Sequence, residues 1–398
     1  MRILQAHNRH ATRGGADDVM DTEKRLLSAA GHEVEQFTVA SGGESGDSAL
    51  GQATKAVVNR SAARELADRI SRFRPDVLHV HTPFPLMSPA VFWTAHRRGV
   101  AAVATLHSFR YSCIAATLRR DGHLCEDCVG KRLKFAGVQH RCYHDSVAAS
   151  AALTTSLVLH KAAGTFRHRV DRFLPLTRFA GDVLVRDGVP AELVTVKPNC
   201  VPEPGPAVRY DSRGDYVLFA GRLVEEKGVE TLLRGWQHAD TGSTRLLVAG
   251  DGALRTAVAT AAATDPTVEP LGWVAADRLE RLQRNALMTL VPSEWYEAGP
   301  PLVMLHALAA GTPVVASDLD NISATLREAG AGLAFRTGDP ASLAQAVERL
   351  LRDASLAKAS SRAARSLYER DHTEAAALRT LESVYRSVLV TAPHDGAR

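Results

Sequence analysis

Tyr216-Val-Leu-Phe-Ala-Gly-Arg-Leu-Val-Glu-Glu-Lys-Gly228 joins an apolar run to a glycine turn and two cations. The apolar run indicates a buried parallel strand that ends at Gly221, and glycine lets the backbone turn and approach a ligand closely. Arg222 and Lys227 then lie on one loop at the carboxyl end of a strand, where open α/β sheets bind ligands. Beside the N-terminus of the helix opened by Lys227-Gly228, they predict a diphosphate site. The alternative is a solvated loop that binds no ligand.

Strand and helix signals alternate along the rest of the chain. Helical patterns such as residues 18–30, 62–73 and 341–352 separate short apolar runs. These runs predict strands near residues 2–7, 34–39, 76–81, 100–107, 172–177, 194–198, 216–220, 245–249, 268–271, 288–291, 313–316 and 332–335. Such alternation predicts an α/β protein whose parallel sheets are covered by helices on both faces.

The length of 398 residues favours two doubly wound, Rossmann-like domains. The Pro- and Gly-rich segment 198–206 is typical of a linker. We therefore expect one domain over residues 1–203 and a second over residues 214–372. The helical tail 373–398 follows the last predicted strand, and we expect it to cross back to the first domain. Two such domains facing each other across a cleft can hold a donor on one side and an acceptor on the other.

The composition is that of a soluble globular protein, with 45% hydrophobic and 23% charged residues. No uncharged apolar run reaches the roughly 18 residues of a transmembrane helix, and no signal-peptide pattern opens the chain. We therefore expect a cytoplasmic protein that meets membranes peripherally at most and binds no nucleic acid. Residues 96–172 carry 13 Lys or Arg against 5 Asp or Glu. This basic excess favours anionic ligands or an anionic membrane face, unless it is only solvated surface.

Further loops of the second half follow predicted strands. Glycines break two of these strands, and a Gly-Pro-Pro turn precedes a helix that begins at Leu302. Free N–H groups at the start of this helix would meet the phosphates held by Arg222 and Lys227. Glu297 precedes the helix and offers an acceptor for sugar hydroxyls. The residues expected to line the donor site with them are Gly221, Gly250, Asp251, Gly272, Gly299, Pro301, Leu302 and Val303.

With these motifs the chain resembles the retaining nucleotide-sugar glycosyltransferases of family 4, which have the GT-B fold. The resemblance covers nearly the whole chain. Its motifs are His7-Asn8, Gly14-Gly15-Ala16-Asp17, Arg74-Pro-Asp-Val-Leu-His-Val-His81, Thr105-Leu-His107, the Arg222/Lys227 loop and the Glu297 segment. It implies transfer of a sugar from a UDP- or GDP-sugar to a hydroxyl of a small-molecule or glycan acceptor, which the basic excess allows to be anionic.

The resemblance also implies roles for individual residues. Arg222 and Lys227 correspond to the pair that binds the donor pyrophosphate. Gly14 and Gly15 correspond to a glycine-rich loop near donor and acceptor. His107 corresponds to a histidine that touches the donor sugar; the alternative is a histidine that only caps a strand end. The first Glu of the family's E-x7-E motif, which binds sugar hydroxyls, corresponds to Glu297.

The implied reaction is front-face substitution without a catalytic cofactor. The acceptor hydroxyl attacks while the diphosphate departs and helps to take the proton. Cationic side chains and helix N–H groups neutralise the leaving group, so no metal is expected at the diphosphate. Consistent with this, we expect no Asp-x-Asp motif at a suitable strand end.

One position departs from the family motif. His306 occupies the place of the second Glu, which usually binds the ribose, and one extra residue lies between Glu297 and this position. A neutral imidazole cannot bridge two ribose hydroxyls as a carboxylate can. The nucleoside is then held differently, or the donor binds weakly, or the protein is a catalytically impaired binding or partner protein. Another GT-B enzyme, such as a phosphorylase, is a further alternative, but no lysine pattern indicates pyridoxal phosphate.

Four cysteines lie within an insertion near residues 108–145. Cys113, Cys125, Cys128 and Cys142 form the pattern C-x11-C-x2-C-x13-C. A close pair flanked by two distant cysteines suits a tetrahedral structural zinc, and a cytosolic enzyme rarely keeps disulfides. Residues 119–143 are otherwise poor in apolar residues, so a metal would order this segment without a core. The alternative is four free thiols, with or without a redox pair.

Overall fold

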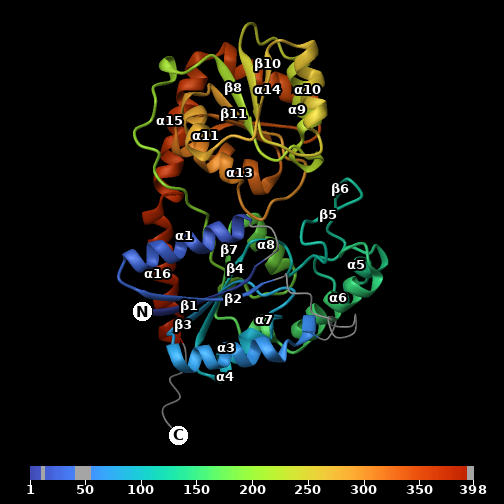
Figure 1. Ribbon diagram of the computed structural model, residues 1–398, viewed down its shortest axis with the longest axis vertical. Coiled ribbons are helices and arrows are strands. Elements are labelled where there is room, and N and C mark those ends of the chain that lie inside the picture. The colour runs from blue at the N-terminus through green and yellow to red at the C-terminus, as the bar shows by residue number, and fades with distance from the viewer. Residues whose placement is uncertain (10–13, 41–54, 392–398) are drawn as a thin grey trace. The chain divides into compact units, whose positions relative to one another are not determined.

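The computed structural model describes residues 1–9, 14–40 and 55–391 (Figure 1). These residues form two compact units. The N-terminal unit comprises Met1–Pro198 together with Leu378–Arg398, and the C-terminal unit comprises Asn199–Ala377. Each unit is built around one parallel sheet flanked by helices, so the predicted α/β fold with two doubly wound sheets is confirmed.

The sheet of the N-terminal unit has the strand order β2-β1-β3-β4-β7. All neighbouring strands in it pair in parallel. Its strands are β1 Arg2–Arg9, β2 Glu33–Ala40, β3 Val77–Thr82, β4 Ala101–Leu106 and β7 Arg172–Pro175. Its helices are α1 Gly15–Ala29, α3 Arg60–Phe73, α4 Ala90–Arg97, α5 Phe135–Gln139, α6 Val147–Ala162, α7 Thr165–His168 and α8 Arg178–Arg186, with the 3-10 turn η1 Ala191–Leu193 and the short antiparallel pair β5 Arg119–Arg120 and β6 His123–Leu124.

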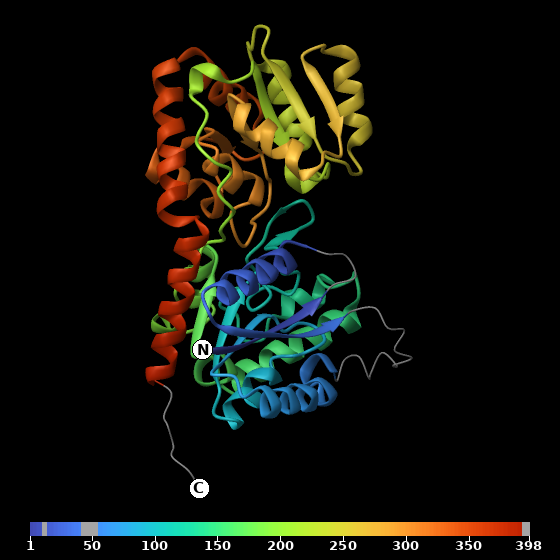
Figure 2. The ribbon, with the colours of Figure 1, turned by 60° about the vertical axis from the view of Figure 1, so that its left-hand side comes forward.

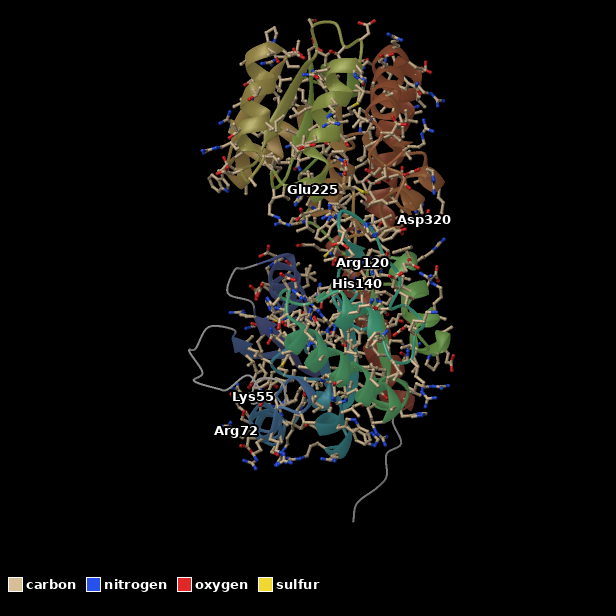
Figure 3. The ribbon with its side chains drawn as sticks, turned by 90° about the vertical axis from the view of Figure 1, so that its right-hand side faces the viewer. Lys55, Arg72, Arg120, His140, Glu225 and Asp320 are labelled. Carbon is tan, nitrogen blue, oxygen red and sulfur yellow. The ribbon has the colours of Figure 1, made fainter. Side chains whose placement is uncertain are left out.

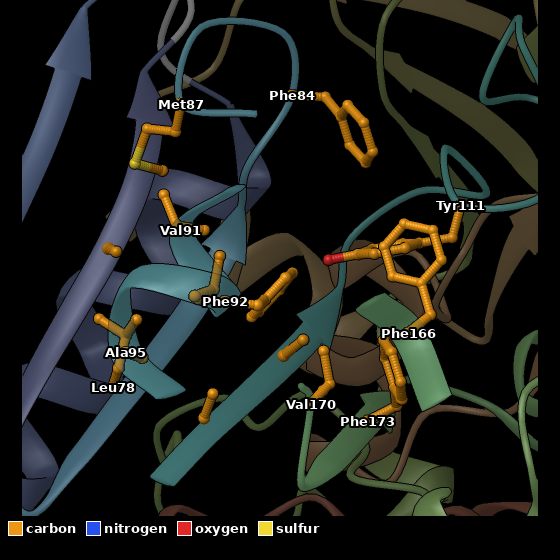
Figure 4. Close-up of a cluster of buried hydrophobic side chains, with 14 of the residues drawn as sticks. Leu78, Phe84, Met87, Val91, Phe92, Ala95, Tyr111, Phe166, Val170 and Phe173 are labelled. Atoms are coloured by element: carbon orange, nitrogen blue, oxygen red, sulfur yellow. The ribbon is translucent and has the colours of Figure 1, made fainter. Parts of the chain in front are cut away.

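Both faces of this sheet are buried. Successive residues of a strand point to opposite faces, so one strand can contribute to two cores. In β4, Ala102 and Ala104 belong to one core, whereas Ala101 and Val103 belong to the other. The first core contains an aromatic cluster in which the Tyr111 ring packs edge-on against the rings of Phe84, Phe166 and Phe173 (Figure 4). Strands buried on both faces read as continuous apolar runs, which is why the sequence indicated them.

The second core of this sheet is closed by the C-terminal helix α16 Glu374–Thr391. Leu381, Val384, Tyr385 and Val388 of α16 pack with Ile3 and Val103 of the sheet. The helix begins within the C-terminal unit, and from Leu378 onward it belongs to the N-terminal unit (red in Figures 1 and 2). The predicted return of the tail to the first domain is therefore confirmed.

The sheet of the C-terminal unit has the strand order β10-β9-β8-β11-β12-β13, again with parallel neighbours. Its strands are β8 Tyr216–Ala220, β9 Arg245–Ala249, β10 Val268–Gly272, β11 Met288–Val291, β12 Val314–Ser317 and β13 Gly332–Phe335. Its helices are α9 Val229–His238, α10 Arg255–Thr264, α11 Ala276–Asn285, α12 Leu302–Ala309, α13 Asp320–Ala329, α14 Pro340–Arg352 and α15 Ala354–Asp371, with the 3-10 turns η2 Tyr210–Ser212 and η3 Glu225–Lys227.

Two predictions of secondary structure were wrong, one of a strand and one of a helix start. Residues 194–198 form no strand but a single bridge, in which Val194 pairs with Phe173. Only Thr195 and Lys197 donate backbone hydrogen bonds to the neighbouring β7, and Pro198 has no N–H to continue the ladder. The helix after the quoted glycine turn begins at Val229 rather than at Lys227, because residues 225–227 form the turn η3 and Gly228 adopts a left-handed conformation with φ of 67°.

Candidate functional site

The strand order of the C-terminal sheet reverses between β8 and β11. From β8 the chain proceeds to β9 and β10 on one side, whereas β11, β12 and β13 follow on the other. Ligands of doubly wound sheets bind beyond the carboxyl ends of the strands at such a reversal. The loops that leave β8 and β11 carry Lys227 and Glu297, two residues that the sequence singled out.

Glycines let these loops approach one another closely. A Cβ added to Gly228 would lie 1.8 Å from the carbonyl oxygen of Pro292, which follows β11. A Cβ added to Gly250 would lie 1.8 Å from the carbonyl oxygen of Gly221. The N–H of Gly250 also donates to the carbonyl of Gly272 at 2.8 Å, so the ends of β8, β9 and β10 are tied together. Side chains at these positions would force the loops apart.

Lys227 and Glu297 form an ion pair at this reversal point. Lys227 Nζ lies 2.5 Å from Glu297 Oε1, and the hydroxyl of Ser293 donates to the same oxygen at 3.1 Å. The two side chains are only 18% and 15% exposed. The amide of Asn321 donates to the Glu297 carbonyl at 2.6 Å, which fixes the loop from the other side. The ammonium is thus held in place at the carboxyl ends of β8 and β11.

Arg222 is the exposed partner in this site. Its side chain is 64% exposed, and its closest acid is Glu226, with Nη2 at 3.7 Å from Oε1. Glu225 of the same loop is labelled in Figure 3. Asp251, which follows β9, is also exposed and accepts the N–H of Gly252. Arg222 is therefore free to reorient toward an anion without losing a buried contact.

The start of α12 offers backbone donors. Gly299, Pro300 and Pro301 lead into the helix, and no side chain caps its first turn. The N–H groups of Leu302 and Val303 therefore lie at a helix N-terminus without a side-chain acceptor, an arrangement that favours an anion. The proline-rich turn explains the extra residue of this segment, since it lengthens the path from β11 to the helix.

His306 lies in the middle of α12. It is half-buried, and burial lowers the pKa of its imidazole, although Glu280 of α11 opposes this effect. The ring is therefore neutral at neutral pH. A neutral imidazole offers one acceptor and one donor, which differs from the two oxygens of the carboxylate that the family motif places here.

One Asp-x-Asp sequence does follow a strand, so the expectation that strand ends lack this motif was wrong. Asp318-Leu319-Asp320 comes directly after β12. Asp318 Oδ1 accepts hydrogen bonds from the N–H and the hydroxyl of Thr337, at 3.0 and 2.7 Å. Asp320 pairs with Arg327 at 3.3 Å and is labelled in Figure 3. Both carboxylates are exposed, and each has a partner within the fold.

In the N-terminal unit, histidines gather where β3 and β4 end. His107 follows β4, and its Nε2 lies 3.0 Å from Nδ1 of His81 at the end of β3, with the two rings stacked at 5.2 Å. Burial above all lowers the pKa of His107 to about 3. Gly14 and Gly15 begin α1 with open space where side chains would stand. The N–H of Gly14 donates to Asp17 at 3.0 Å.

Beneath these histidines lies an ion pair that the sequence analysis missed. Glu23 of α1 and Lys197 are each 1% exposed, and Lys197 Nζ lies 2.6 Å from Glu23 Oε1. A sequence signal for Glu23 existed, because it occupies the apolar stripe of α1 between the buried residues Met20 and Leu27. A charged residue on such a stripe is almost never fully buried without a partner.

The four cysteines of the insertion line one small enclosed cavity. Burial raises the pKa of the Cys142 thiol to about 11 and also raises the pKa values of the Cys125 and Cys128 thiols, so these three thiols are protonated at neutral pH. All five cysteines of the chain are free of disulfides. Arg120 and His140, labelled in Figure 3, belong to the same segment.

The insertion is also ordered by a buried lysine that the sequence analysis missed. Lys134 is 1% exposed, and its ammonium lies 2.8 Å from Asp187. It also donates to the carbonyls of Ser112 and Cys128, at 2.9 and 3.0 Å. The segment therefore does not depend on a metal alone for its order.

Comparisons with known proteins match both halves of the chain. Residues 13–203 match the model of Glycosyltransferase Family 4, and residues 214–353 match that of Glycosyl transferases group 1. An uncharacterised glycosyltransferase of Methanocaldococcus jannaschii is 32% identical over 141 residues, which are 34% of this chain and 36% of that protein. A phosphatidyl-myo-inositol mannosyltransferase of Mycobacterium leprae is 34% identical over 147 residues, 36% of this chain and 39% of that protein. The chain thus spans little more than a third of the length of these curated relatives.

Solved structures show the same fold over nearly the full length. Anabaena HepE, solved in complex with UDP, superposes with a TM-score of 0.66 and 13% identity, covering 97% of this chain and 100% of that one. The sucrose-phosphate synthase of Thermosynechococcus elongatus superposes with a TM-score of 0.68 and 17% identity, covering 98% and 99%. Across residues 1–9, 14–40 and 55–391, we find no helix with the length and apolar character needed to cross a membrane.

Proposed function

This chain belongs to the family 4 glycosyltransferases of the GT-B fold, and from that premise we propose that it transfers a sugar from a nucleoside-diphosphate sugar to an acceptor hydroxyl. The proposed donor is a UDP- or GDP-sugar, and the anomeric configuration is retained. The observation that carries the proposal is the ammonium of Lys227, held by Glu297 at the strand reversal of the C-terminal sheet. HepE, which has the same fold, was solved in complex with UDP, and this supports a UDP-type donor.

The proposed chemistry uses cations in place of a metal. Lys227 has three N–H donors, so it can keep one on Glu297 and turn the others to phosphate oxygens. Arg222 adds a planar donor pair from the exposed side of the same loop. The N–H groups of Leu302 and Val303 complete the cradle. Together these groups stabilise the negative charge that develops on the leaving diphosphate.

The proposed substitution proceeds on one face of the sugar. The acceptor oxygen forms a bond to the anomeric carbon while the bond to the diphosphate oxygen breaks, and the acceptor proton passes to the diphosphate. Glu297 binds hydroxyls of the donor sugar, and His107 contacts the sugar from the N-terminal unit. The basic excess over residues 96–172 supports an anionic acceptor.

A second candidate rests on His306. If the nucleoside requires the missing carboxylate, the protein binds its ligand weakly and acts as a catalytically impaired partner protein. The intact Lys227–Glu297 pair favours the enzyme, because a protein that no longer binds a diphosphate has no need of a fixed ammonium there.

The test is release of nucleoside diphosphate from a panel of UDP- and GDP-sugars, with and without candidate acceptors. We expect one donor to be hydrolysed slowly and consumed faster with an acceptor, and Lys227→Ala to abolish both. Arg234→Ala is the matched control, since Arg234 is a cation of α9 that is 67% exposed. Binding of a nucleotide sugar without any turnover would favour the impaired protein, and absence of binding would overturn the proposal.

We further propose that Cys113, Cys125, Cys128 and Cys142 hold a structural zinc. Their convergence on one cavity supports this, and zinc, if bound, would take the four sulfurs as thiolate ligands. Elemental analysis of protein purified without chelator should find about one zinc per chain, and none in Cys125→Ser/Cys128→Ser. Four titratable thiols and no metal in the native protein would refute the site. Cys113, Cys125, Cys128 and Cys142 form no disulfide in the described part of the chain, and this supports the cytoplasm as the proposed compartment.

A further inference from the structure

The buried ion pair of Glu23 and Lys197 leaves one carboxylate oxygen unused. Lys197 Nζ lies against Glu23 Oε1 at 2.6 Å. The pKa of Glu23 would be raised by burial, but the charge of Lys197 and its hydrogen bond outweigh this and lower it, so Glu23 is an anion. An ionised carboxylate only accepts hydrogen bonds. Its second oxygen, Oε2, has no hydrogen-bond partner within bonding distance, although it is buried.

Two buried histidines of β3 compete for Oε2. His79 Nδ1 and His81 Nε2 each lie 3.5 Å from it. Both nitrogens of His79 have closer partners, the hydroxyls of Tyr385 and Thr105, each at 2.8 Å. Nε2 of His81 has none. The unused oxygen and the unused nitrogen are therefore each other's remaining partners, and a shift of a few tenths of an ångström closes the bond.

The protonation of His81 follows from this pairing. Burial holds the pKa of His81 well below its usual value, so the ring is neutral and carries one N–H. Because Glu23 can only accept, that hydrogen lies on Nε2 of His81, and Nδ1 is left bare. Nδ1 of His81 lies 3.0 Å from Nε2 of His107, so it must accept a hydrogen from His107. Nδ1 of His107, which has no hydrogen-bond partner in the described part of the chain, is then bare as well.

We propose that Glu23 is a positioning residue that fixes the tautomer of His107 through His81, so that His107 presents a bare Nδ1 as a hydrogen-bond acceptor. The ligand group that fits a bare imidazole nitrogen is a hydroxyl, not a phosphate oxygen, because a phosphate has no hydrogen to donate at neutral pH. This inference rests on the proposed function where it identifies that hydroxyl as one of the donor sugar. The tautomer itself is a property of the N-terminal unit alone.

A metal is the other use that the cluster allows. The ligand atoms of Glu23, His79 and His81 all lie within 4.8 Å of one another. The Lys197 ammonium already neutralises the carboxylate at 2.6 Å, and Tyr385 occupies the nitrogen that His79 would offer. A divalent cation would have to displace both, so the contacts favour the hydrogen-bond chain.

The tautomer is measurable without any substrate. In protein with ¹⁵N-labelled histidine, long-range ¹H–¹⁵N spectra distinguish a bare ring nitrogen from one that carries hydrogen, and His107→Asn identifies the signals of His107. We expect a protonated Nε2 and a bare Nδ1 from pH 6 to pH 8. A protonated Nδ1 in the wild type overturns the proposal. A spectrum unchanged in Glu23→Leu/Lys197→Met also overturns it, since this variant removes every acceptor at position 23 while it keeps the charge balanced.

The matched control is Lys134→Met/Asp187→Asn. It removes another buried lysine–carboxylate pair of the same unit, so it reproduces a general loss of stability. It should leave the His107 signals in place. If Glu23→Leu/Lys197→Met does not fold, Glu23→Met/Lys197→Leu provides the same readout, because it also leaves no acceptor at position 23.

A second experiment measures KM for donor sugars in which single hydroxyls are replaced by hydrogen or fluorine. Fluorine accepts but does not donate, so at the hydroxyl that meets His107 both analogues should raise KM to a similar extent, roughly tenfold. A fluoro analogue that binds much better than the deoxy analogue at every position would show that His107 donates instead. If no donor binds at all, the proposed function fails while the spectrum still decides the tautomer.

Discussion

The reversal point of the N-terminal sheet and that of the C-terminal sheet use the same architecture for different chemistry. In the C-terminal unit the strand ends β8 and β11 carry glycines, an exposed Arg222 and a lysine close to the surface. In the N-terminal unit the sheet reverses between β1 and β3, and the polar groups around β3 and β4 are buried: Glu23, Lys197, His79 and His81 are each at most 1% exposed. The reversal point of the C-terminal sheet presents cations that an anionic ligand can reach. The reversal point of the N-terminal sheet holds a buried ion pair.

The contrast shows what a lysine–glutamate pair does in each place. Lys197–Glu23 and Lys227–Glu297 have similar distances, 2.6 and 2.5 Å. The first pair has no access to solvent and serves the fold and the histidines above it. The second is partly exposed and can exchange its glutamate for a ligand. Burial, not geometry, separates a structural pair from a binding pair.

We expect the largest difference between the two units at acidic pH, where the N-terminal unit should lose more stability. Burial lowers the pKa of His79, His81 and His107 in the N-terminal unit, so their folded pKa values lie below the ordinary 6.5. The free energy of unfolding that these neutral histidines allow is fully present above pH 6.5. It falls by about 1.4 kcal/mol per pH unit for each histidine as pH drops below 6.5. For His107 this loss continues down to about pH 3. The lowered pKa of Glu23 adds a further loss below its ordinary value of 4.5.

The C-terminal unit has fewer such groups, with His306 and His372 as its histidines of lowered pKa. Hydrogen exchange at pH 7 and pH 4 should therefore show the N-terminal unit losing protection first. If the C-terminal unit opened first at pH 4, the buried histidines would not be the acid-sensitive element.

The same substitution at the two lysines should have opposite consequences. Lys197→Met leaves the Glu23 carboxylate buried without a counter-ion and should lower the free energy of unfolding by about 3–5 kcal/mol. Lys227→Met leaves Glu297 with the Ser293 hydroxyl and partial access to water, and should change it by under about 1 kcal/mol. Urea denaturation of both variants measures the difference. Equal losses would mean that the exposed pair is as structural as the buried one.

Ligand binding should then reverse the order of the two variants. Charge-assisted hydrogen bonds contribute about 1.5–3 kcal/mol, so Lys227→Met should weaken nucleoside-diphosphate binding by roughly tenfold or more. Lys197→Met, assayed where it is folded, should keep the wild-type affinity. Calorimetry with UDP and GDP checks both. Unchanged affinity in Lys227→Met would remove this lysine from the diphosphate site.

The two regions also differ in how far the sequence could predict them. The C-terminal site is local: Gly221, Arg222 and Lys227 lie on one loop, and strand periodicity places that loop at the end of the sheet. The buried network joins residues far apart in the chain, such as Lys197 with Glu23 and Tyr385 with His79, separated by 174 and 306 positions. No single-sequence pattern reports such pairs. The incorrect prediction of a strand at residues 194–198 also contributed to missing the ion pair of Lys197. A strand predicted from its apolar residues does not indicate a partner for a lysine within it.

The smallest expected effect concerns His306, where the sequence pattern and the structure meet. If the ribose lies near α12 as the family motif implies, His306→Glu supplies two acceptor oxygens and should tighten donor binding by about 1–2 kcal/mol. The structure sets a condition on this gain, because Glu280 of α11 acts on the same position and would repel a carboxylate. His306→Glu should therefore gain most in a Glu280→Gln background, and His306→Gln, which adds no charge, is the matched control. Calorimetry and the melting temperature measure the outcome. Tighter binding with an unchanged melting temperature supports the ribose position that the family motif implies. Weaker binding or a lowered melting temperature shows that the longer Gly-Pro-Pro turn has moved the ribose to another partner.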